Sequence, residues 1–158
     1  AGLQQDERRL EVGRQIGAER TIVLSKDNQQ PLTDEIRALG DGLGVDVVID
    51  ATGHSATLKP AMAAVRPNGQ ITKVGWGPQP LDFSLDPLVG KAARLQGSFS
   101  HNYPIWEKVI ALMAAGRLDP RPLVGRVEPL AGWQSCFDGM ASGEIVKGVL
   151  KPASESRG

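Results

Sequence analysis

The chain has 158 residues, about one domain's length, and its 41% hydrophobic and 23% charged residues are an ordinary globular balance. Lysine plus arginine equal aspartate plus glutamate at 18 each, so the chain lacks the basic excess typical of nucleic-acid-binding proteins. No apolar run approaches the roughly 20 residues that cross a bilayer, and the single cysteine, Cys136, excludes an internal disulfide. We therefore expect no nucleic-acid or membrane partner, and a cytoplasmic location.

The first half of the chain is predicted to alternate helices with short apolar strands. The expected elements are helices over residues 6–16 and 33–39 and strands over residues 21–24 and 45–50. Thr33 is expected to be the N-cap of the second helix, and Gly40 to end it. The strand at 45–50 hardly alternates between apolar and polar residues, which is typical of a parallel strand with both faces covered.

The next helix has two possible starts, because Pro60 cannot donate a helical hydrogen bond. Either the helix begins at Ser55 and kinks at Pro60, or it begins near Lys59 with Pro60 in its first turn. We expect it to end before a turn at residues 67–69 (PNG), with a strand following at 71–74.

The second half is predicted to continue with a long loop and then further helices and strands. The expected elements are a loop over 75–87, strands over 92–99, 123–127 and 145–150, helices over 105–115 and 131–140, and a frayed tail over 152–158. The helix at 105–115 has the clearest signals, with Pro104 at its start and Gly116 just past its end.

Two apolar runs that end in glycine carry the functional information. The runs at 45–53 and 66–75 are separated by about a dozen helix-compatible residues, which predicts a β-α-β unit of a parallel sheet. Ligands of such sheets bind at the carboxyl ends of the strands. The sequence therefore predicts a binding site where Thr52-Gly53 and Gly75-Trp76 follow these strands.

These segments resemble zinc-type medium-chain dehydrogenases, the family of alcohol, sorbitol and threonine dehydrogenases. The resemblance is carried by residues 45–53, the turn 66–69, Val74-Gly75, and a C-terminal pattern from Pro122 through Trp133 to the run 143–148 (GEIVKG). It covers nearly the whole chain, and it implies an α/β fold: a partial Rossmann-like doubly wound parallel sheet plus the C-terminal return segment of the catalytic domain. The implied domains are 1–121 for nucleotide binding and 122–152 for the return segment, with 153–158 as a tail.

The resemblance implies that the strand ends hold the nicotinamide half of NAD or NADP. Thr52 and Gly53 would approach the nicotinamide ribose, with the alternative that Gly53 is only a glycine that its turn requires. The backbone of Val74, Gly75 and Trp76 would face the nicotinamide ring or its ribose, with the alternative that Trp76 only covers the core.

Three further positions are carried over from the family. The backbone of Ser98 and Phe99 would hydrogen-bond the nicotinamide carboxamide, with the Phe99 side chain used for packing. Lys147 matches a cation that contacts the cofactor pyrophosphate, and the alternative is a solvated lysine.

The residue that reads the ribose departs from the family pattern. Members that use NAD carry an acidic residue at the end of the second strand, whereas alignment on Arg9-Leu10 places Gln4 there. Without this acid a 2′-phosphate is tolerated, and Arg8 or Arg9 could pair with it. The choice between NAD and NADP therefore stays open.

The family's glycine-rich loop and zinc ligands would lie before Ala1, so we expect zinc in the full-length enzyme but no zinc ligands and no catalytic residues in this chain. His54, His101 and Cys136 have no metal-ligand spacing, and we interpret them as two loop histidines and an inert cysteine. The chain is expected to be a fragment, or the ordered part of something longer, and inactive by itself.

The predicted function is the cofactor-binding part of an NAD(P)-dependent oxidoreductase acting on a small alcohol or polyol. The alternatives are a zinc-free quinone or enoyl reductase relative, or a non-catalytic fragment that only folds, dimerises or binds nucleotide. A homo-oligomer is expected, because zinc-type relatives pair across the segment 81–96, whose apolar residues a monomer would expose.

The strand order 3-2-1-4-5-6 adds an expectation about the sheet. Residues 21–24 would be strand 3 and residues 45–50 strand 4, while strand 1 and nearly all of strand 2 are missing between them. We therefore expect either that Ile22 pairs directly with Val47 or Val48, or that residues 1–40 are loosely held.

Overall fold

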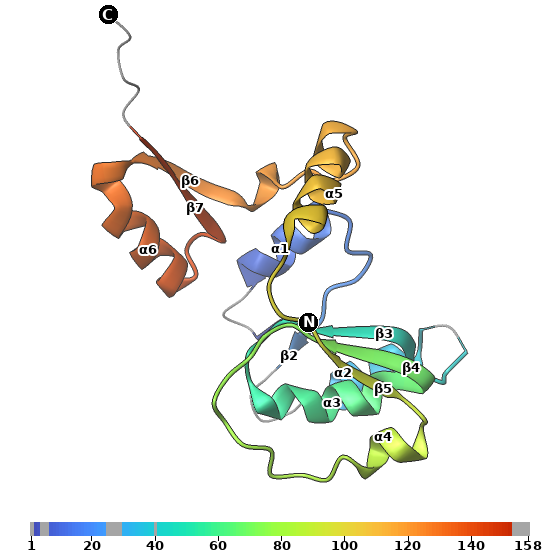
Figure 1. Cartoon of the computed structure of the whole chain (residues 1–158). Helices are drawn as coiled ribbons and strands as arrows, with labels where there is room; N and C mark the ends of the chain where they lie inside the picture. The colour runs from blue at the N-terminus through green and yellow to red at the C-terminus, as the bar shows by residue number, and fades with distance from the viewer. Residues whose placement is uncertain (1, 4–6, 25–29, 40, 153–158) are drawn as a thin grey trace, which may run out of the picture. The chain divides into compact units, whose positions relative to one another are not determined.

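The computed structural model of the chain describes residues 2–3, 7–24, 30–39 and 41–152, which form parallel sheets with helices beside them (Figure 1). They divide into two compact units, one of residues 26–101 and one of residues 1–25 with 102–158. The α/β class is confirmed, and the expected domain boundary at residue 121 stays a prediction. Across the described ranges, no helix combines the length and apolarity that a membrane span requires.

The unit of residues 26–101 is built on a three-stranded parallel sheet. Its strands are β3 (Val45–Asp50), β4 (Val65–Lys73) and β5 (Arg94–Gly97), in the order β3-β4-β5. The helices α2 (Gln30–Arg37), α3 (Leu58–Ala64) and α4 (Asp86–Gly90) belong to the same unit, and α3 packs against β3 and β4 (Figure 1).

The core of this unit lies between α3 and the sheet. Leu58, Ala61 and Met62 follow one another at the i, i+3, i+4 spacing of a helix face, and all three are buried. They pack with Val65 and Ile71 of β4, which are fully buried. The edge of this core is covered by partly buried side chains, namely those of Val48, Phe83, Leu88 and Ala93.

The start of α3 distinguishes between the two predicted alternatives. A short 3₁₀ helix, η2 (Ser55–Thr57), comes first, and α3 begins at Leu58 with Pro60 in its first turn. The second alternative is therefore confirmed. In α2, by contrast, Thr33 lies inside the helix rather than at its N-cap, so that part of the prediction is wrong.

The predicted turn at 67–69 is instead part of β4. Val45 pairs with Val65 and Val47 with Gln70, so β4 accommodates three extra residues as a bulge. Asn68 has a φ of 60° and its N–H donates to the Lys91 carbonyl at 2.8 Å. The strand therefore begins at Val65, because tertiary hydrogen bonds hold the turn-forming residues within the sheet.

Part of the expected loop after β4 is helical. The helix α4 begins with Asp86-Pro87, and its Leu88 packs against the core. The short span of α4 gave no recognisable helical periodicity, and burial of Leu88 and Phe83 explains why the apolar residues cluster there.

Lys91 closes the C-terminal end of α3. Its ammonium donates hydrogen bonds to the carbonyls of Met62 (2.8 Å), Ala63 (2.9 Å) and Val65 (2.6 Å), which stand at the negative end of the helix dipole. We expect Lys91→Met to lower the free energy of unfolding by about 1–3 kcal/mol, because buried carbonyls lose a charged donor. Denaturant melts measure this loss, and Lys59→Met, an exposed change on the same helix, is the control. Equal stability of the two variants would contradict the capping role.

The second unit contains the N-terminal strands and helix. The strand β1 (Gly2–Leu3) pairs in parallel with β2 (Val23–Leu24), and α1 (Glu7–Gln15) connects them. The predicted pairing of Ile22 with Val47 or Val48 is therefore wrong, since β3 pairs with β4 alone within the described ranges. The reason is that Gly2 and Leu3 still supply β2 with its own neighbour. The alternative of loosely held residues 1–40 stays a prediction.

The same unit continues with α5 (Tyr103–Ala114) and a small β-α-β element. Pro104 lies in the first turn of α5 as predicted, and the Asn102 side chain caps the helix by accepting from the Ile105 N–H at 3.3 Å. Two 3₁₀ turns, η3 (Arg121–Leu123) and η4 (Leu130–Gly132), flank the strand β6 (Val124–Pro129). The helix α6 (Trp133–Ser142) leads to β7 (Lys147–Lys151), which is parallel to β6 (Figure 1).

Cys136 is buried in this small element. The residue is 1% exposed, and its Sγ and Cβ lie close to Gly148 of β7. A side chain at Gly148 would occupy the space of the thiol, so the cysteine serves here as a small apolar contact between α6 and β7.

Candidate functional site

The three strands of the central sheet end at the same edge. Asp50 at the end of β3 pairs with Lys73 at the end of β4, and Lys73 pairs with Gly97 at the end of β5. Since the strands are parallel, the segments that follow them leave the sheet side by side. This is the edge at which the sequence predicts a ligand site.

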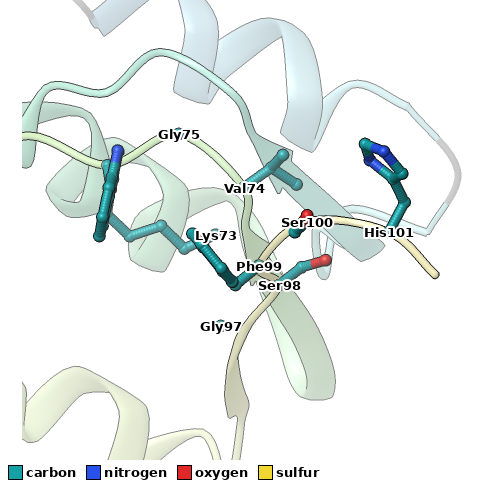
Figure 2. A pocket seen from close by; sticks show the side chains of 9 residues that line it. Lys73, Val74, Gly75, Gly97, Ser98, Phe99, Ser100 and His101 are labelled. Atoms are coloured by element: carbon teal, nitrogen blue, oxygen red, sulfur yellow. The ribbon is translucent and has the colours of Figure 1, made fainter.

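An open pocket of about 630 Å³ lies at this edge (Figure 2). It is lined by the segment that follows β4 (residues 73–76) and the segment that follows β5 (residues 97–101). The Val74, Trp76 and Phe99 side chains are largely exposed there, and the rings of Trp76 and Phe99 pack at a centroid distance of 5.6 Å with a tilt of 51°. The pocket is therefore mainly apolar, with Ser98, Ser100 and His101 supplying polar groups.

The structure brings five of the expected cofactor contacts to this pocket: Val74, Gly75, Trp76, Ser98 and Phe99. Trp76 is 79% exposed and Phe99 is 81% exposed, so neither ring covers the core. The two rings pack on each other instead, which agrees with the packing expected of Phe99, and the role of Trp76 in cofactor binding stays a prediction.

Glycines allow the turn after β3 to lie directly against the segment after β4. A Cβ at Gly75 would stand 2.7 Å from the Ala51 carbonyl carbon and 2.9 Å from the Thr52 nitrogen. Gly53 has a φ of +75°, and a Cβ there would stand 3.1 Å from the Trp76 carbonyl oxygen. Gly53 is thus required by its turn, and the close approach brings Thr52 and Gly53 beside the residues that line the pocket.

A buried carboxylate lies beneath this turn. Asp50 is 4% exposed, and its Oδ1 accepts hydrogen bonds from the Thr52 N–H (3.1 Å) and hydroxyl (2.8 Å). Its Oδ2 is 3.1 Å from the Lys73 ammonium, and the Thr57 hydroxyl lies 3.1 Å from both carboxylate oxygens. Burial alone raises the pKa of the Asp50 carboxyl, but the hydrogen bonds from Thr52, Lys73 and Thr57 outweigh it and hold that pKa below its ordinary value.

Sequence reasoning missed the roles of Asp50, Thr57 and Lys73. A signal was present for the first of these, because a carboxylate that ends a buried apolar strand needs charged or hydrogen-bonding partners. Its partners could not be read from the sequence, since Thr57 and Lys73 lie 7 and 23 residues further along the chain.

His54 takes part in the turn through its backbone. Its N–H donates to the Thr52 hydroxyl at 3.3 Å, and its carbonyl accepts from the Thr57 N–H (3.3 Å) and hydroxyl (2.6 Å). This fits the interpretation of His54 as a loop histidine. His101 lines the pocket at the far end from Gly75 in Figure 2.

The remaining expected cofactor contacts lie elsewhere. Arg9 is on α1, where its guanidinium donates to the Met140 carbonyl at 3.4 Å, and Lys147 is the first residue of β7. Both belong to the unit of residues 1–25 and 102–158. Gln4 lies outside the described residues. The roles of these three in cofactor binding stay predictions.

A zinc ion does not fit the described part of the chain. Within it, no group of three or more histidine, cysteine, aspartate or glutamate side chains is arranged to hold a metal. The polar groups that line the pocket are the hydroxyls of Ser98 and Ser100, the His101 imidazole, Lys73 and backbone groups, which suit an organic ligand.

Residues 1–115 match the family model described as zinc-binding dehydrogenase, and the chain belongs to that family. It is 30% identical over 151 residues to the uncharacterized zinc-type alcohol dehydrogenase-like protein YdjL of Escherichia coli (strain K12), covering 94% of this chain and 41% of that protein. It is 28% identical over 152 residues to a sorbitol dehydrogenase of Halalkalibacterium halodurans, covering 96% and 43% of the two chains.

Among solved structures, the alcohol dehydrogenase TADH from Thermus sp. ATN1 is similar, with a TM-score of 0.80 and 27% identity over 95% of this chain and 42% of that one. The resemblance inferred from the sequence is thereby confirmed. The chain spans about two fifths of the length of the relatives that it matches.

Proposed function

We propose that this chain supplies the nicotinamide side of an NAD(P) site in an oxidoreductase that transfers a hydride between an alcohol or polyol and the cofactor. The observation that carries the proposal is the alignment of Asp50, Lys73 and Gly97 at one edge of the sheet, with an apolar pocket directly beyond it. Membership of the zinc-binding dehydrogenase family supports the same function.

Each strand end has a distinct task in this proposal. The turn of Thr52 and Gly53 holds the nicotinamide ribose, and the backbone of Ser98 and Phe99 holds the carboxamide. When bound, the nicotinamide supplies the hydride acceptor or donor. The apolar side chains of the pocket exclude water from the face where the hydride passes. The catalytic zinc and its ligands belong outside the described residues, and the isolated chain is expected to show no alcohol oxidation.

Titration of the full-length protein, as its gene encodes it, with NADH and NADPH tests this function. Both cofactors quench tryptophan fluorescence by energy transfer when they bind nearby, and Trp76 is exposed at the pocket. We expect saturable quenching by at least one cofactor, with a smaller amplitude in Trp76→Phe than in the control Trp133→Phe. No binding of either cofactor would reject the proposal, and the preferred cofactor decides between NAD and NADP.

Lys147→Ala is expected to weaken cofactor binding by about 1–3 kcal/mol, the range for losing a hydrogen bond to a charged group. The physical reason is that the pyrophosphate needs a fixed positive charge. Equilibrium titration with the preferred cofactor measures the effect, and Lys151→Ala, at the other end of β7, is the control. Affinity for the alcohol should hardly change. Equal cofactor affinity of both variants would establish Lys147 as a solvated lysine.

Association into a homodimer or larger symmetric oligomer is expected through β5 and α4. The strand β5 is the last in its sheet and all four of its residues are exposed, while Val89 of α4 is 80% exposed. Val89→Glu should shift the protein toward the monomer without unfolding it, because the side chain has no core packing to lose. Sedimentation that shows a monomeric wild-type protein at tens of micromolar would contradict this prediction.

A further inference from the structure

We propose that Asp50 is a positioning residue of the cofactor site: its buried carboxylate fastens the Thr52–Gly53 turn to the end of β4, so that the surface facing the nicotinamide ribose is already formed before the cofactor binds. This proposal rests on the proposed function, since it assigns that surface to the cofactor. Asp50 itself lies beneath the turn and contacts no ligand.

Asp50 connects both segments that leave the sheet at this edge. Its Oδ1 accepts from the Thr52 backbone and hydroxyl, an arrangement in which an aspartate side chain shapes the turn two residues later. Its backbone carbonyl accepts from the N–H groups of Val74 (2.8 Å) and Gly75 (3.0 Å). One residue therefore holds the turn after β3 and the first residues of the pocket wall after β4.

The two threonine hydroxyls supply two protons to the contacts around Asp50. Thr52 Oγ1 and Thr57 Oγ1 are 2.8 Å apart, and each carries a single proton. Thr57 Oγ1 is also 2.6 Å from the His54 carbonyl, so one of the two protons can serve that carbonyl while the other serves the carboxylate. The Thr52 N–H donates to Oδ1 and the Lys73 ammonium donates to Oδ2, so an ionised Asp50 accepts on both oxygens.

Lys73 makes the ionised state tolerable. Its ammonium lies 3.1 Å from Oδ2, and the lysine side chain is 26% exposed whereas that of Asp50 is 3% exposed. In Asp50→Asn the amide oxygen can still accept from Thr52, but its NH₂ group then faces the ammonium, a donor against a donor. Replacing both partners, as in Asp50→Asn with Lys73→Met, removes this conflict.

The residues of this network are not among the side chains that form the apolar core of the unit. Thr52 is exposed and Thr57 is half-buried, whereas the core residues Leu58, Met62 and Ile71 pack between α3 and the sheet. Loosening the turn should therefore affect the ligand surface more than global stability. This separates a positioning role from a purely structural one, and it can be measured.

The test compares Thr57→Val, Thr57→Ser, Asp50→Asn and the double variant of Asp50→Asn with Lys73→Met in the full-length protein. Asp46→Asn is the control, because Asp46 is on the same strand but its side chain is 82% exposed in an ion pair with Arg66. The readouts are the melting temperature, hydrogen exchange at the Thr52 amide and the dissociation constant for NADH.

We expect Thr57→Val and Asp50→Asn to speed exchange at Thr52 and to raise the NADH dissociation constant about tenfold, which corresponds to about 1.4 kcal/mol. Thr57→Ser should keep the exchange rate at Thr52 and the NADH dissociation constant of the wild type, because serine retains the hydroxyl. The double variant should recover part of the exchange protection. Asp46→Asn should match the wild type in every readout. NADH affinity that is unchanged in Thr57→Val and Asp50→Asn would overturn the positioning role alone. A loss of NADH affinity that is fully explained by the fraction of unfolded protein in each variant would also overturn the positioning role. Failure of the wild-type protein to bind either cofactor would overturn the proposed function, and this proposal with it.

Discussion

Gly75→Ala is expected to lower the free energy of unfolding by about 1–3 kcal/mol, the usual cost of an added carbon in a packed site, and to abolish detectable NADH binding. The added Cβ would press on the backbone of Ala51, Thr52 and Gly53, where the nearest atoms are main-chain atoms that cannot rotate away. The turn after β3 would therefore have to leave the end of β4, and the ligand surface would separate into two parts.

The control for this substitution is Gly97→Ala at the end of the neighbouring strand. A Cβ at Gly97 meets no atom within 4 Å, so this variant should keep the stability of the wild type. Denaturant melts give the stabilities and tryptophan quenching gives the affinities. If Gly75→Ala were as stable as Gly97→Ala and bound NADH equally well, the close approach of the two strand ends would not be needed for the site.

Acidification is expected to destabilise the unit of residues 26–101, and Asp50→Asn should remove much of this dependence. The pKa of Asp50 is lowered in the folded protein, so its contribution is present above the unfolded pKa of about 3.9 and is lost as pH falls through the lower folded value. The sign follows because the unfolded chain binds the proton more readily, and stability therefore rises with pH across this window.

We expect the lost contribution to be about 1–3 kcal/mol, toward the lower end because the Lys73 side chain is 26% exposed to solvent. Denaturant melts from neutral pH down to pH values below the unfolded pKa measure it. Asp119→Asn is the control: its carboxyl has a pKa lowered to about 2 by the hydrogen bonds and charge of Arg121, but both side chains of the pair are exposed to solvent and should affect stability little. A pH dependence in Asp50→Asn that equals that of the wild type would assign the acid sensitivity to other groups.

The strand β3 shows how far sequence alone could predict the fold. Its observed bounds, Val45–Asp50, coincide with the predicted run, because four of its six residues are valine or isoleucine, which favour a strand. The start of α5 was also predictable, since Pro104 is preorganised for the first turn of a helix. The edge of the sheet that holds the pocket followed from these elements, because parallel strands present their carboxyl ends together.

Local chemistry by itself thus determined most of the strands and helices, a parallel β-α-β unit and the positions at which a ligand site should be sought, whereas the family followed from the resemblance to zinc-type dehydrogenases. Tertiary contacts alone decided that β4 extends back to Val65, that Gly2 and Leu3 stay beside β2, and that Lys91 caps α3 from outside the helix. They also created the network of Asp50 with Thr57 and Lys73. The physical reason is that propensities and turn signals act over a few neighbouring residues. A buried charge, in contrast, is stabilised only by partners that the folded chain brings from elsewhere in the sequence.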